Sequence, residues 1–151
     1  MATRRELLEN WFRRVWGEQD EGAVDELFEG EGRAFGLSAS PMVGPGDFKP
    51  FHRALRGLLT DFRVTVDDAT ESGDRIWAVC TLHAKTRDSA ARPVAVRGLV
   101  IVRFADGKIV EAFNLWDFLA MFAATGQLPA DAFERGLAGR PVCGPSDSAG
   151  A

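Results

Sequence analysis

The chain has 151 residues, of which 46% are hydrophobic and 26% are charged. This length fits one domain with its own core, and the composition is that of a globular protein, which excludes the disordered and fibrous classes. The 18 Lys and Arg against 22 Asp and Glu give a net charge of −4, so we expect no nucleic-acid partner, because phosphate binding needs a concentrated basic face. Apolar runs such as 99–102 are too short to span a bilayer, and the N-terminus lacks the apolar stretch of a signal peptide. We therefore expect a cytoplasmic protein with no membrane partner.

Helical spacing dominates the first residues of the chain. Thr3 and Glu6 form a capping box, and apolar residues follow at helical intervals, which predicts a helix over 3–17. A second, short helix is predicted over 22–28.

The next stretch, 29–47, is rich in Gly, Ser and Pro, so we predict a loop around one short strand over 34–37. Asp47 is the predicted N-cap of a third helix. Phe51 and His52 lie on the apolar face of that helix.

The pattern changes after residue 60 to long runs of β-branched and apolar residues with turn signals between them. The predicted strands cover 62–69, 75–86, 93–104 and 108–116. Short helices are predicted over 118–125 and 130–137. The short connections favour antiparallel pairing. We therefore predict an α+β fold in which helices pack on a curved antiparallel β-sheet, with one domain over 1–138 and a flexible tail over 139–151.

Asp106-Gly107 is the strongest hairpin signal in the sequence. A two-residue turn there would set Val102 opposite Glu111 on the more apolar face of the sheet, which should meet the helices. Val100, Phe113 and Asp117 would lie on that same face. Asn114 would then fall on the other face, together with Arg97 and Trp116. One β-bulge between Glu111 and Asp117 would reverse the assignment of Asp117.

The chain offers few groups for metal or redox chemistry. The two cysteines, Cys80 and Cys143, lie far apart and lack metal-ligand spacing, and there are only two histidines, His52 and His83. We expect no metal site, and we expect both thiols to be reduced.

The order of these elements, with Gly44-Pro45, Gly73-Asp74, 106–111 and Trp116-Asp117, resembles the SnoaL-like polyketide cyclases, which belong to the nuclear-transport-factor-two-like superfamily of cone-shaped folds. The resemblance implies a cone with an internal apolar cavity and a homodimer formed through the convex face. It also implies cofactor-free chemistry, in which an aspartate near the end of the last strand removes a proton next to a carbonyl. Asp117 matches that position.

A base of this kind needs a donor for the enolate oxygen, and His52, His83 and Arg97 are the candidates. The tyrosine of ketosteroid isomerases and the Asp-Arg-Asp set of limonene epoxide hydrolases are missing, which disfavours both activities. The predicted lining of an apolar pocket is aromatic: Phe113, Trp116, Phe118, Phe122, Trp77 and Phe51.

Each candidate residue also has a structural interpretation. Asp117 would equally serve as the N-cap of the helix that follows it, and Glu111 as a surface charge. His52 would equally be a packing residue. His83 lies on one of two alternating faces, and Arg97 would stack on Trp116 at a dimer interface.

Three functional hypotheses follow. The first is a cyclase or isomerase acting on a hydrophobic carbonyl compound with Asp117 as the base. The second is a non-catalytic protein of the same fold that binds a hydrophobic small molecule. The third is an oligomerisation module whose cavity is filled by its own side chains.

Overall fold

The computed structural model describes residues 1–142. The chain groups into two compact units, Met1–Trp116 and a second that begins at Asp117. They are called unit 1 and unit 2 below and are described separately. The single domain predicted over 1–138 thus spans unit 1 and part of unit 2. Of the predicted tail, 143–151 lies outside the described residues, as does Cys143.

Unit 1 contains a six-stranded sheet with the order β2-β1-β6-β5-β4-β3. The strands are β1 (Phe28–Phe35), β2 (Met42–Val43), β3 (Leu59–Ser72), β4 (Arg75–Thr86), β5 (Pro93–Ala105) and β6 (Lys108–Trp116). Their neighbours pair antiparallel, as predicted, with one exception: β1 runs parallel to β6. The sheet is therefore mixed, and the expectation of a wholly antiparallel sheet was wrong at this pair.

The first strand was predicted mainly as loop, and its composition explains the error. Residues 29–33 alternate glycine with charged residues, so the apolar period of a strand is hidden. Gly32 is buried in place of a larger side chain because the Phe28 ring and the Ile109 carbonyl occupy the space that a Cβ there would need. This strand becomes visible only through its pairing with β6.

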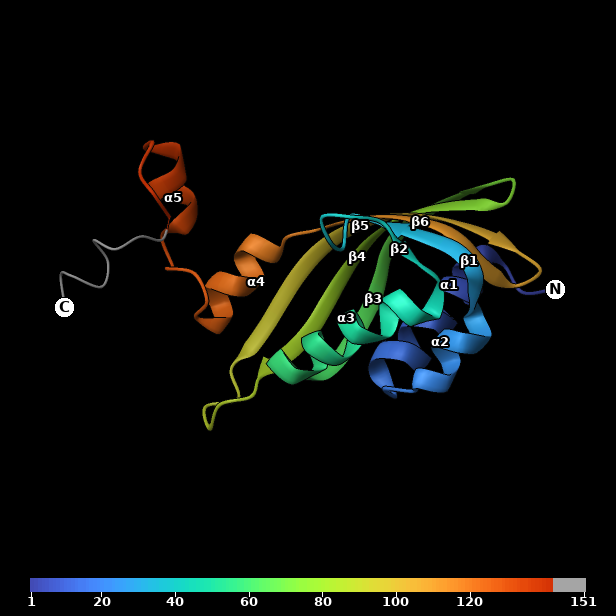
Figure 1. Ribbon diagram of the computed structural model, residues 1–151, viewed down its shortest axis with the longest axis horizontal. Helices are drawn as coiled ribbons and strands as arrows, with labels where there is room; N and C mark the ends of the chain where they lie inside the picture. Colours follow the sequence, from blue (N-terminus) through green and yellow to red (C-terminus); the bar gives the residue numbers. More distant parts are fainter. Residues whose placement is uncertain (143–151) are drawn as a thin grey trace. The chain divides into compact units, whose positions relative to one another are not determined.

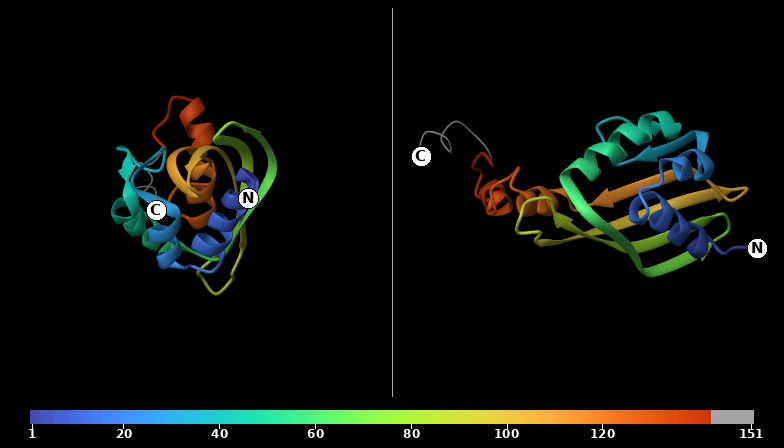
Figure 2. Two further views of the ribbon diagram at one scale, coloured as in Figure 1. Left: turned by 90° about the vertical axis from the view of Figure 1, so that its right-hand side faces the viewer. Right: turned by 90° about the horizontal axis from the view of Figure 1, so that it is seen from below.

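Four helical segments pack against one face of this sheet, which curves around them (Figures 1 and 2). They are α1 (Arg4–Trp11), the π-helical segment η1 (Phe12–Gly17), α2 (Glu21–Leu27) and α3 (Gly44–Leu58). The predicted capping box is present: Thr3 Oγ1 accepts from the Glu6 amide at 3.1 Å, and Glu6 Oε2 accepts from the Thr3 amide at 2.8 Å. Helix α3 begins before Asp47, which was predicted as its N-cap but instead accepts the Val43 amide at 2.8 Å.

The hairpin between β5 and β6 has the predicted turn but a different register. Phe104 pairs with Ile109 as expected, whereas a β-bulge shifts the next pair to Arg103 and Glu111. Because side chains alternate along a strand, one inserted residue moves the rest of β6 to the opposite faces. Asn114 and Trp116 thus point toward the helices and Phe113 points away, the reverse of the two-residue-turn expectation.

Aromatic rings fill much of the space between helices and sheet. Phe48 of α3 meets Trp11, Trp16 and Phe28, with ring centroids 5.3 to 6.1 Å apart. All four side chains are buried. Tilted and edge-to-face rings at such separations add to the stabilisation from apolar burial.

Unit 2 contains α4 (Phe118–Thr125) and α5 (Ala132–Leu137). Helix α4 begins and ends where the sequence predicts, whereas α5 begins two residues later than predicted. Gly126 ends α4 in the left-handed conformation, with φ of 87°, which glycine adopts at little cost.

Candidate binding pocket

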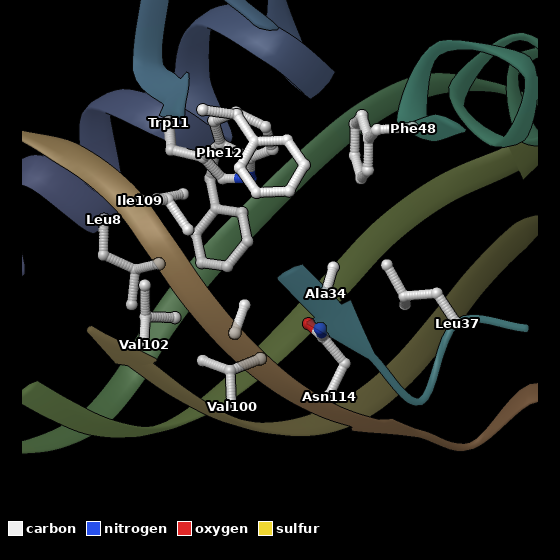
Figure 3. A pocket seen from close by; sticks show the side chains of 12 residues that line it. Leu8, Trp11, Phe12, Ala34, Leu37, Phe48, Val100, Val102, Ile109 and Asn114 are labelled. Carbon is white, nitrogen blue, oxygen red and sulfur yellow. The ribbon is translucent and has the colours of Figure 1, made fainter. Parts of the chain in front are cut away.

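A pocket lies inside unit 1, between the helices and the sheet (Figure 3). Twelve residues line it: Leu8, Trp11, Phe12, Phe28, Ala34, Leu37, Phe48, Val100, Val102, Ile109, Ala112 and Asn114. None of the twelve carries a charged or titratable side chain. The pocket has a volume of about 40 Å³, which leaves room for about three water molecules.

Asn114 is the one lining residue with a polar aliphatic side chain, and Figure 3 shows its amide group directed into the pocket from β6. Its Nδ2 donates to the Phe35 carbonyl at 3.1 Å. Because a carbonyl only accepts, this bond fixes the NH2 group toward Phe35 and leaves Oδ1 as the free acceptor. Within residues 1–142, no group donates to Oδ1.

The parallel pairing of β1 and β6 holds that amide in place. Phe35 pairs with Phe113, the residue before Asn114. Gly36 follows with φ of 87°, and a Cβ there would overlap the Asn114 backbone carbonyl. The end of β1 can therefore approach β6 closely enough for the Phe35 carbonyl to reach the Asn114 side chain.

Trp11 supplies the second polar atom of the lining. Its side chain is 7% exposed, and its indole nitrogen is drawn with the pocket in Figure 3. No group within residues 1–142 accepts a hydrogen bond from Nε1. The nitrogen is also not sealed from solvent. The donor is therefore both unpaired and accessible.

His52, a predicted catalytic residue, is fully buried in α3 and is not part of this lining. Its Nε2 lies 2.7 Å from the Val15 carbonyl and therefore carries a proton. Its Nδ1 is buried with no partner among the described residues. Burial lowers the pKa of the imidazole, because the cation would lose hydration. In this arrangement His52 joins α3 to η1, as the packing alternative predicts.

Asp117, the predicted base, is the N-cap of α4. Its Oδ1 accepts from the Ala120 amide at 3.0 Å. This is the structural interpretation given above for an aspartate at a strand-to-helix junction. One oxygen of the carboxylate is engaged, and the proposed catalytic role remains a prediction.

The other polar candidates lie on the sheet face turned away from the helices. Along β4 the even-numbered residues from Ile76 to Ala84 are buried and the odd-numbered residues are not, which places His83 on that outer face. Arg97 pairs with Thr81 there. The predicted stacking of Arg97 on Trp116 is wrong, because Trp116 stands opposite Gly98 and meets Phe12 on the inner side.

Glu111 forms ion pairs with Arg75 and Arg103 at 3.6 and 3.9 Å, as the surface-charge interpretation predicts.

The six aromatic residues predicted to line a cavity do not line this pocket. Trp77 and Phe113 are 40% and 41% exposed, and Phe113 stacks on Phe35 with centroids 4.8 Å apart. Trp116 is inside unit 1 against Phe12, and Phe51 packs edge-on against Trp16. The remaining two lie in α4, with centroids 6.3 Å apart: Phe118 and Phe122.

Sequence reasoning missed both polar groups of the pocket. Trp11 lies within the helix predicted over 3–17, but the free indole N–H follows from packing. Asn114 was assigned to the opposite face because nothing in the sequence marks the bulge before it. The β5 residues Val100 and Val102 were predicted to face the helices and do line the pocket.

Within residues 1–142, no group of three His, Cys, Asp or Glu side chains has an arrangement that could hold a metal ion. None of the helices there has both the length and the apolar character needed to cross a membrane.

Comparisons with known proteins indicate the SnoaL-like family and its fold. The family model of the SnoaL-like domain matches residues 8–112, a stretch that ends before Asn114 and Asp117. No curated protein sequence matches the chain.

Similar solved structures include a candidate SnoaL-like polyketide cyclase from Jannaschia sp. CCS1, with 22% identity, a TM-score of 0.69, and coverage of 82% of this chain and 92% of that one. A protein from Catenulispora acidiphila with a ketosteroid isomerase-like fold, in complex with trimethylamine, has 20% identity and a TM-score of 0.69 over 83% and 95% of the two chains. IdmH from Streptomyces antibioticus, a candidate polyketide cyclase, has 17% identity and a TM-score of 0.70 over 83% and 99%. At these identities the likeness shows the fold alone.

Proposed function

This chain belongs to the SnoaL-like domain family, and from that premise we propose that it binds a small, uncharged, apolar molecule in the pocket of unit 1. The observation that supports the proposal is the lining, because none of its twelve residues is charged. Moving a charged ligand from water into such a lining costs several kcal/mol unless a counter-charge meets it. Transfer of a neutral ring from water into the same lining is favourable, because apolar surface is buried.

The size of the pocket narrows the choice of ligand. At about 40 Å³ the space is well below the roughly 300–1,000 Å³ of ordinary ligand pockets. Leu37 is the one lining residue outside a helix or strand. Loop residues shift more readily than residues in paired strands. We therefore propose that a one-ring molecule enters as the Leu37 side chain moves aside.

Three compounds of similar size test this function. Ethylbenzene and acetophenone are neutral, whereas benzoate carries a charge. We expect the neutral compounds to shift the amide NMR signals of lining residues such as Val100 and Ala112, and benzoate to leave them in place. Shifts confined to the outer sheet face, or equal binding of benzoate, would overturn the proposal.

The second candidate function is cofactor-free proton abstraction by Asp117. Two observations favour it: the chain belongs to the SnoaL-like domain family, and the solved structures similar to the chain include candidate polyketide cyclases. Acetophenone in D2O provides a readout: its α C–H bond breaks, the proton passes to the Asp117 carboxylate, and the enolate takes a deuteron from solvent. Catalysed loss of the methyl signal would support the enzyme.

Asp117→Asn is the informative variant, because asparagine also caps helices but is not a base. Under the catalytic proposal the exchange falls to the uncatalysed rate while α4 remains folded. If wild type and Asp117→Asn exchange the probe equally, Asp117 is not the base.

A further inference from the structure

The pocket holds two unpaired polar atoms in an otherwise apolar lining. One is the indole Nε1–H of Trp11, a donor on a side chain that is 93% buried, since 7% is exposed. The other is Oδ1 of Asn114, an acceptor whose orientation is set by the bond from Nδ2 to the Phe35 carbonyl. The two side chains that carry these atoms line the same pocket (Figure 3).

Polar groups in an apolar lining are normally satisfied by a hydrogen bond to protein, water or a ligand. Trp11 could have been a phenylalanine, and Asn114 a leucine, with no polar atom left unpaired. Water can occupy the apo pocket, which has room for about three molecules. A ligand that displaces this water regains its hydrogen bonds only by supplying an acceptor to Trp11 and a donor to Asn114.

We propose that Trp11 and Asn114 determine the specificity of this pocket, an inference that rests on the proposed function. Together they select a neutral ring compound that carries both a carbonyl and a hydroxyl group. The carbonyl oxygen accepts from Trp11 Nε1–H, and the hydroxyl donates to Asn114 Oδ1. The two bonds fix the orientation of the ring between apolar walls. A carboxylate is rejected because no positive charge lines the pocket.

The test uses ratios of dissociation constants for probes of one ring. The first ratio compares ethylbenzene with acetophenone and isolates the carbonyl. The second compares acetophenone with 4-hydroxyacetophenone and isolates the hydroxyl. In wild type we expect each added group to tighten binding about fivefold, the effect of one ordinary hydrogen bond. Because each ratio is taken within one protein, a general loss of stability cancels.

Two variants assign the effects to atoms. Trp11→Phe removes the N–H and should bring the first ratio close to one while leaving the second. Asn114→Leu should do the reverse. Trp16→Phe is the matched control, because Trp16 is a buried tryptophan outside the lining, and we expect both ratios to stay at their wild-type values.

The outcomes separate this inference from the function on which it rests. If ethylbenzene binds in the pocket as tightly as either ketone, the two-point recognition is overturned and apolar binding stands. If no neutral probe binds, the proposed function fails as well. The wild-type ratios decide this even where a variant does not fold.

Discussion

Gly98 of β5 stands directly opposite Trp116 of β6, and the indole ring of Trp116 occupies the space that a Cβ at residue 98 would need. The close approach follows from the bulge that turns Trp116 inward. It lets the ring lie against the strand backbone and meet Phe12 of η1, with centroids 6.4 Å apart. The absence of a side chain at Gly98 of β5 thereby determines where the Trp116 ring of β6 can lie.

Gly98→Ala should therefore destabilise unit 1 by about 1–3 kcal/mol, the usual cost of overpacking. Urea unfolding measures the change. Gly57→Ala is the control, because a Cβ there meets open space and alanine favours a helix by about 1 kcal/mol. If the two variants have the same stability, the ring does not lie against Gly98.

His52 should make stability depend on pH. Burial keeps the pKa of the folded imidazole below its ordinary 6.5, so the unfolded state binds more protons as the pH falls below that value. The free energy of unfolding should therefore be highest above pH 6.5. It should decrease as the pH falls below 6.5 and level off once the pH is below the pKa of the folded imidazole. His52→Leu should remove this decline and His83→Gln should keep it. An unchanged slope in His52→Leu would contradict the assignment.

Leu37 limits the size of the pocket if the proposed entry of a ring is correct. Leu37→Ala should tighten the binding of ethylbenzene by a few-fold, because less reorganisation accompanies entry. Calorimetric titration measures the change. Leu115→Ala, on the outer sheet face, removes the same side chain away from the pocket and should leave the affinity as in wild type. Weaker binding by Leu37→Ala would show that Leu37 contacts the ligand instead of obstructing it.

The outer sheet face carries an apolar patch that we expect to pair with a second copy of the chain. Leu99 and Leu115 stand opposite each other and are 52% and 71% exposed. Asp67, held by Thr81 Oγ1 at 2.5 Å, and Arg97 lie on the same face, so two copies can match charges of opposite sign. Light scattering should show a dimer that Leu115→Lys dissociates.

Leu137→Lys, at an exposed leucine of α5, is the control and should remain dimeric. A wild-type monomer at high concentration would contradict the expectation.

Local patterns in the sequence determined the elements with strong periodicity. Two strands, β4 and β6, begin and end at the predicted residues because turn signals and alternating apolar residues mark them, and the helix α4 does so because Gly126 ends it. The capping box of α1 is equally local, since its partners are three residues apart. The family resemblance rested on the order of these elements, and the match of the family model confirms it.

Only the tertiary structure decided the positions that depend on contacts distant in sequence. The bulge after Ile109 adds one residue to β6, and it reversed which side of β6 faces the helices. The parallel pairing of β1 with β6 brought the Phe35 carbonyl to Asn114, 79 residues away. The sequence determined that this protein has an apolar interior, but register and packing placed the two unpaired polar groups inside it, because a single inserted residue exchanges the two faces of a strand.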